Sequence, residues 1–73
     1  MKTARELFEE LGFKQIAKVE GEGIGYMKEE PYVGVSFIYG QKVVVVDDEL
    51  IYKTLDMSLF KAIQKQLQEL GWI

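Results

Sequence analysis

The stretch that decides the fold is Tyr32–Asp48, which reads Y-V-G-V-S-F-I-Y-G-Q-K-V-V-V-V-D-D. Two runs rich in Val, Ile, Phe and Tyr flank Gly40-Gln41, and this pattern predicts a β-hairpin. A strand with one solvated face should alternate apolar and polar residues, but Val43–Val46 is apolar throughout. Because side chains alternate along a strand, two of these valines must face away from whatever covers the other two.

The turns set the register in which the strands pair. A loop of two or four residues centred on Gly40-Gln41 places Phe37 opposite Val44 and Val35 opposite Val46. The same reasoning applies to the preceding turn, Glu30-Pro31. The face of the sheet that packs against the helices then carries Ile24, Tyr26, Val35, Phe37, Val44 and Val46. The opposite face carries Met27, Gly34, Ser36, Ile38, Val43 and Val45, with Tyr32 at its rim. A three-residue bulged loop would exchange the two pairs of valines and still leave one pair turned away from the helices.

Amphipathic helices are predicted at both ends of the chain. The first spans residues 3–11, where Thr3 and Glu6 form a capping box and Gly12 ends the helix. Its apolar stripe, at helical spacing, is Ala4, Leu7, Phe8 and Leu11.

The second helix spans residues 57–70, with Asp56 or Ser58 as its cap and Gly71 at its end. We expect its stripe to consist of Phe60, Ile63, Leu67 and Leu70, helped by Leu59 and Ala62. The two helix ends are alike, and the Schellman motif predicts that Phe13 pairs with Phe8 and Trp72 with Leu67.

These elements predict an α+β fold, a two-layer sandwich formed by a single domain, residues 1–73. The expected order is α-β-β-β-α, with a three-stranded antiparallel meander and both helices on one face. The ranges that read as strands are 13–20, 24–29, 32–39 and 42–48. Of these, 13–20 is a weak strand whose buried face the sequence does not assign. Residues 50–55 form a connector that could add a short edge strand.

Composition limits the classes of function. The 73-residue chain has no Cys and no His, so thiolate chemistry and the commonest general base are missing. No Ser or Tyr has an evident base partner. We therefore expect no enzymatic activity, no cofactor and no small-molecule substrate. No apolar run reaches membrane-spanning length, and Met1–Glu6 lacks the apolar core of a signal peptide, so the expected location is cytoplasmic.

Two short motifs suggest ligands but fit structural roles better. Gly21-x-Gly23-x-Gly25 resembles a phosphate-binding loop, yet a strand rather than a helix N-terminus follows it. The acidic clusters Asp47-Asp48-Glu49 and Glu29-Glu30 lack the spacing of a calcium loop, and successive residues on a strand point to opposite faces. We expect a glycine-rich turn and strand-ending charges, and no metal site.

The α-β-β-β-α order is that of the double-stranded-RNA-binding domain, so Lys53, Lys61 and Lys65 were compared with its RNA-binding residues. In that family the second helix begins with a lysine cluster and the first β-β loop carries Gly-Pro-x-His. Here the helix begins Met57-Ser58-Leu59-Phe60, the loop reads Gly21-Glu22-Gly23-Ile24, and the net charge is −3. Nucleic-acid binding is therefore the alternative function, and a nucleic-acid partner is not favoured.

The leading candidate for a functional surface is the face of the sheet away from the helices. Ile38, Val43 and Val45 are cross-strand neighbours there, with Tyr32 at the rim, and they form a contiguous apolar patch. Isolated surface apolar residues are normal, but a small domain has few to spare. We expect a protein-interaction site whose partner is a second copy of the chain, as a homodimer, or another protein.

The chain ends also carry a resemblance. Met1–Phe13, M-K-T-A-R-E-L-F-E-E-L-G-F, and Lys61–Trp72, K-A-I-Q-K-Q-L-Q-E-L-G-W, resemble uncharacterised small proteins encoded by phages and prophages of Gram-positive bacteria. The resemblance covers about a third of the chain and rests on helix stripes and stops. It implies an accessory protein of a phage or mobile element, cytoplasmic in a host cell, whose partner other than itself would be a protein of the host or phage. The resemblance transfers no site residues.

Overall fold

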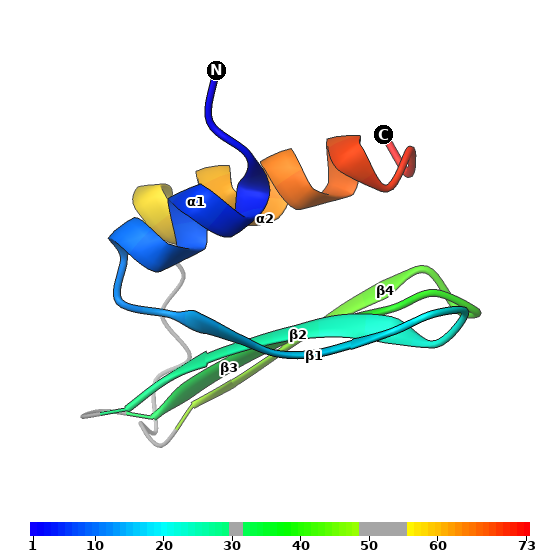
Figure 1. The fold of residues 1–73 in the computed structure, drawn as a ribbon, viewed down its shortest axis with the longest axis horizontal. Helices are drawn as coiled ribbons and strands as arrows, with labels where there is room; N and C mark the ends of the chain where they lie inside the picture. Colours follow the sequence, from blue (N-terminus) through cyan, green and yellow to red (C-terminus); the bar gives the residue numbers. More distant parts are fainter. Residues whose placement is uncertain (30–31, 49–55) are drawn as a thin grey trace.

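A computed structural model describes residues 1–29, 32–48 and 56–73. The element order is α-β-β-β-β-α (Figure 1). The elements are α1 (Ala4–Glu10), β1 (Lys14–Val19), β2 (Gly23–Lys28), β3 (Val33–Ile38), β4 (Val43–Asp48) and α2 (Met57–Glu69). The expected edge strand at 50–55 lies outside the described residues.

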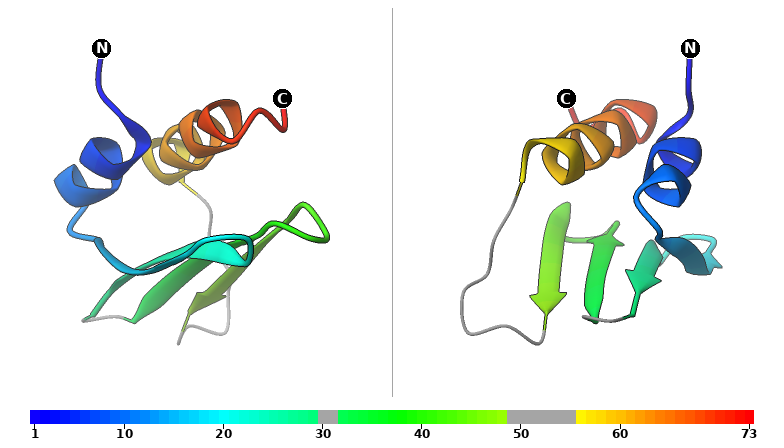
Figure 2. Two further views of the ribbon diagram at one scale, coloured as in Figure 1. Left: turned by 45° about the vertical axis from the view of Figure 1, so that its right-hand side comes forward. Right: turned by 90° about the vertical axis from the view of Figure 1, so that its left-hand side faces the viewer.

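The fold has two layers, as predicted. The strands form one antiparallel sheet in the order β1-β2-β3-β4, and both helices lie over the same face of it (Figures 1 and 2). The α+β class is therefore confirmed. The prediction of a three-stranded sheet is wrong, because the weak strand expected at 13–20 is present as β1 and pairs with β2. The order consequently differs by one strand from that of the double-stranded-RNA-binding domain.

The pattern of β1 is weak because of its place in the sheet. It is an edge strand, and most of its residues are exposed. Its pairing with β2 shifts between Gln15 and Ala17, so Ile16 is an extra residue in a β-bulge. The bulge breaks the period-two alternation, and as a result the apolar residues of the strand do not indicate a single face.

The register of the other strands agrees with the prediction from the turns. Residues 39–42 form a four-residue loop, and Phe37 pairs with Val44 while Val35 pairs with Val46. In β2, Ile24 pairs with Phe37 and Tyr26 with Val35. These residues all contribute to the core beneath the helices, and the intervening residues of each strand turn away from it.

Aromatic side chains form the centre of the core. Phe8 of α1 stacks on Tyr26 of β2, with ring centroids 4.0 Å apart, and meets Phe13 and Phe37 edge-on. α2 adds a buried stripe at helical spacing, consisting of Leu59, Ala62, Ile63 and Gln66. The expected place of Phe60 in this stripe is wrong: its side chain is 41% exposed, and the neighbouring Leu59 is buried instead.

Gln66 is the buried polar residue of this stripe, and its partner is on the sheet. Its side-chain oxygen Oε1 accepts a hydrogen bond from the Tyr26 hydroxyl at 2.6 Å. Buried polar groups are stable only when they are paired in this way. Burial, followed by the nearby charge of Glu69, raises the pKa of Tyr26 to about 12. This hydrogen bond anchors α2 to β2.

The helix ends follow the predicted capping. Thr3 and Glu6 form the capping box of α1, and Asp56, rather than Ser58, caps α2. Both C-termini are Schellman motifs, with left-handed glycines at Gly12 and Gly71. Phe13 packs edge-on against Phe8, whereas the Trp72 amide bonds to the carbonyl of Leu67 and its ring meets Tyr39.

Lys42, in the β3–β4 loop, has a φ of 54° and is the non-glycine residue with positive φ in the described ranges. A left-handed conformation disfavours a residue with a Cβ. We expect Lys42→Gly to raise the free energy of unfolding by roughly 0.5–1 kcal/mol, measured by chemical denaturation. The neighbouring Gln41→Gly is the control, because residue 41 has no positive φ and gains nothing from glycine. Equal effects of the two substitutions would contradict this account.

The raised pKa of Tyr26 predicts how stability depends on pH. The unfolded chain loses the Tyr26 proton near pH 10, whereas the folded protein holds it to about pH 12. The free energy of unfolding should therefore fall as pH rises through this window, by up to about 2 kcal/mol from this group. Denaturation at several pH values would measure the slope. Tyr26→Phe should remove this part of the slope, and an unchanged slope would show that Tyr26 is not its origin.

Candidate interaction surface

The face of the sheet opposite the helices, here called the open face, is organised in three rows that cross all four strands. The first row is Val19, Gly23, Ile38 and Val43, from β1 to β4. The second row is Ala17, Gly25, Ser36 and Val45. The third row is Lys14, Met27, Gly34 and Asp47. Rows one and two are almost entirely apolar, and row three carries a charge at each edge of the sheet.

The apolar part of the open face consists of large aliphatic side chains that remain exposed. These are Ile16 (52% exposed), Val19 (47%), Ile38 (38%), Val43 (38%) and Val45 (45%), here called the aliphatic patch. They come from β1, β3 and β4, so the patch extends from one edge of the sheet to the other. An exposed apolar surface of this continuity is typical of a contact site rather than of scattered surface residues.

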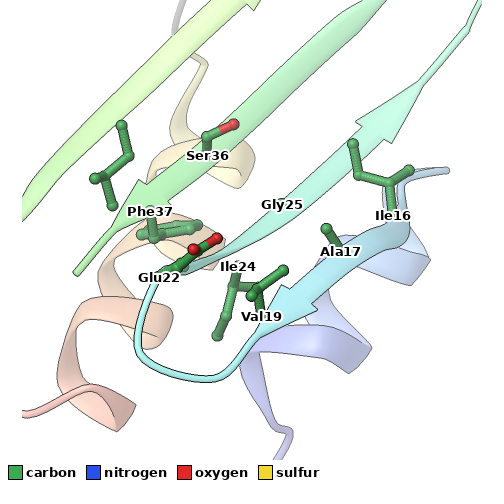
Figure 3. A pocket seen from close by; sticks show the side chains of 10 residues that line it. Ile16, Ala17, Val19, Glu22, Ile24, Gly25, Ser36 and Phe37 are labelled. Carbon is green, nitrogen blue, oxygen red and sulfur yellow. The ribbon is translucent and has the colours of Figure 1, made fainter. Parts of the chain in front are cut away.

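A groove runs through the patch along β2. Its volume is about 240 Å³, and it lies between Ile16 and Val19 of β1 on one side and Ile38 of β3 on the other. β2 contributes only Gly23 and Gly25 to rows one and two, so no β2 side chain fills the groove; the Ile16 side chain of β1 leans over Gly25, 3.2 Å from where a Cβ would be. Figure 3 shows Gly25 between the β1 side chains and Ser36 of β3. The groove can receive an apolar side chain from another molecule.

The expected interaction residues divide between the two ends of the open face. Ile38, Val43 and Val45 lie together in rows one and two. Tyr32 lies apart from them and covers Gly34, where its hydroxyl oxygen would be 2.6 Å from a Cβ at that position. Tyr32 is therefore placed beside the polar row rather than within the patch.

Sequence reasoning missed the β1 half of the surface. Ile16 and Val19 belong to the patch, but the bulge at Ile16 hides their common face. One signal was available: Gly23 and Gly25 are two residues apart, so on a strand they must share a face. Two such glycines predict a local depression, but its second wall is visible only when β1 is placed.

Metal-binding clusters and membrane-spanning helices were both sought among the described residues. No three His, Cys, Asp or Glu side chains among them come together as a metal site, and no helix described is long and apolar enough to span a membrane. A second hollow, between α1, α2 and β1, is polar and includes Thr3, Gln15 and Glu69. Glu69 accepts a hydrogen bond from the Ala4 amide at 2.7 Å there. The Glu69 carboxylate therefore caps the start of α1.

Comparison of the chain with protein-family models, with curated proteins and with solved structures gives no match.

The two groove glycines should respond differently to substitution. A Cβ at Gly23 would overlap the backbone carbonyl oxygen of Phe37, whereas at Gly25 it would meet the Ile16 side chain at 3.2 Å. Because the exposed Ile16 can rotate and a backbone carbonyl cannot, Gly23→Ala should destabilise the fold by roughly 1–3 kcal/mol. Gly25→Ala should stay within about 0.5 kcal/mol of the wild type. Chemical denaturation would compare them, and an equal cost would contradict the local geometry.

Proposed function

We propose that this protein is a small non-enzymatic interaction domain that binds another protein chain through the open face of its sheet. The observation that carries the proposal is the aliphatic patch, which crosses the whole sheet and is hollowed along β2. Strand β4 contributes to both faces of the sheet. Val44 and Val46 pack against the core beneath the helices, whereas Val43 and Val45 belong to the aliphatic patch. Both uses come from one run of valines.

The energetics support a binding role for this face. Fully burying a Val or Ile side chain contributes roughly 1.5–3 kcal/mol, so covering the exposed part of each patch residue contributes roughly 1 kcal/mol. The described core of this small domain has few large residues, with Phe8, Phe37 and Val35 the largest that are fully buried. The five exposed aliphatic side chains are therefore a substantial share of its apolar content. Exposed apolar residues of this kind favour association with another chain.

The alternative of nucleic-acid binding gains no support from the positions of the lysines. The described lysines lie on β1, β2, the β3–β4 loop and both chain ends, including α2. Lys14 and Lys18 of β1 even occupy opposite faces, since their partners Met27 and Ile24 do. Phosphate backbones are bound by a continuous basic surface, and these residues do not form one.

The cellular context belongs to the same proposal. The helical ends resemble small proteins of phages and prophages, and the chain has no Cys that would call for an oxidising compartment. We place the protein in the cytoplasm, as an accessory protein of a phage or mobile element. In this setting the open face would bind either another copy of the chain or a protein of the host or phage.

Site-specific photo-cross-linking tests the proposed surface. A photoreactive residue at Ser36, exposed in the centre of the open face, should give protein adducts in the organism that encodes the chain. The same residue at Gln64, exposed on α2, is the matched control and should give few. Val45→Lys should reduce the Ser36 adducts by about tenfold, because a charge in the patch opposes burial. Phe60→Lys introduces the same charge on α2 and should leave them unchanged.

The contrary result is equally specific. If Ser36 and Gln64 give the same few adducts while the protein remains folded by circular dichroism, the open face is not a binding surface.

A further inference from the structure

We infer that the occupant of the open face is a second copy of this chain, packed sheet against sheet about a two-fold axis that runs along the strands between β2 and β3. This inference rests on the proposed function and names its partner. It follows from how the three rows of the open face match themselves under symmetry.

A face-to-face dimer with two-fold symmetry has its axis in the plane between the sheets. An axis along the strands keeps each row over the same row of the partner, so the apolar rows one and two cover each other. An axis across the strands reverses the order and places row one, with Val19 and Val43, over row three, with Lys14 and Asp47. Burying charges against valines is unfavourable, so the axis along the strands is preferred.

The shape of the open face fits this axis. With the axis between β2 and β3, β2 of one copy lies over β3 of the other. In row one this places Ile38 of β3 above Gly23 of the partner copy, and in row two it places Ser36 above Gly25. The groove along β2 therefore receives the Ile38 side chain of the second copy. By symmetry the contact is made twice, which is the self-complementarity that such an interface requires.

The charges of the open face fit the same axis. β1 of one copy lies over β4 of the other, so in row three Lys14 faces Asp47 of the second copy. Two ion pairs result, one at each edge of the sheet, both at the row-three end of the interface. Because aligned sheets pack about 30° apart, the corners lie at the solvated rim, where charges set orientation more than affinity. Charge and shape thus select one arrangement independently.

The size of the face predicts a weak dimer. Four strands about 4.8 Å apart and six residues long at about 3.3 Å each give a face of about 400 Å². Two such faces bury on the order of 800–1,000 Å² in total, below the about 1,200 Å² of standard stable interfaces. We expect a monomer–dimer equilibrium with a dissociation constant on the order of 100 µM.

A charge exchange tests the partner and the axis together. In sedimentation equilibrium, Lys14→Asp or Asp47→Lys alone should weaken the dimer about tenfold, because each places like charges opposite each other at both corners. The double variant, Lys14→Asp with Asp47→Lys, should return to within about twofold of the wild type. Only an interface in which these two residues face each other between copies restores binding in this way. Circular dichroism would check that each variant remains folded.

A second measurement does not depend on charge. The chain has no Cys, so Val19→Cys with Val43→Cys provides a clean pair of thiols. A bismaleimide too short to span the roughly 14 Å from β1 to β4 of one sheet should link two copies of this double variant. Each single variant should give little cross-linked dimer, because position 19 of one copy faces position 43 of the other. In a single variant the two thiols of the dimer therefore do not face each other.

The possible outcomes distinguish a failure of this inference from a failure of the proposed function. A wild type that is monomeric at about 1 mM, with Ser36 adducts to a different protein, overturns the second copy as partner and keeps the open face as a binding surface. A dimer that the double charge exchange fails to restore, and that the double-cysteine variant does not trap, overturns the axis. A monomer with no Ser36 adducts overturns both proposals.

Discussion

The pairing of Phe37 with Val44, fixed by the four-residue loop at 39–42, determines the rest of the structure. Because a slip of one residue would move every side chain of β4 to the other face, this register decides which valines lie beneath the helices. Val44 and Val46 contribute to the core, and Val43 and Val45 remain on the outside. The helices, the core and the open face all follow from this local constraint.

The core shows how a small domain can fix the position of a helix with few apolar residues. α2 is oriented by the hydrogen bond from Tyr26 to Gln66, and Tyr26 is itself held by stacking on Phe8 of α1. One tyrosine thus connects the sheet to both helices. A hydrogen bond is directional, so this contact specifies one rotation of α2 more closely than apolar packing alone would.

The sequence allowed prediction wherever the determining forces are local. The length of a turn and the alternation of side chains along a strand are local features, and they predicted the register of β2, β3 and β4. The N-cap at Thr3 and the glycines that end the two helices are local features too. β1 was missed as a full member of the sheet because its bulge at Ile16 depends on the neighbouring strand. Leu59 rather than Phe60 is in the buried stripe, and Gln66 can be buried there because Tyr26, distant in sequence, supplies a hydrogen-bond partner. The groove needed both β1 and the glycines of β2, and only the tertiary fold brings them together.

The hydrogen bond between Glu69 and the amide of Ala4 has a consequence for how the chain is made. These residues are 65 positions apart, so the start of α1 is completed only by the last turn of α2. On the ribosome, α1 and the meander therefore emerge before α2, and the part of the core that α2 covers stays open until synthesis reaches α2. The sheet assembles by short-range hairpins, whereas the helical layer closes through long-range contacts. Folding should consequently proceed from the middle of the chain outward, with the two ends joining last.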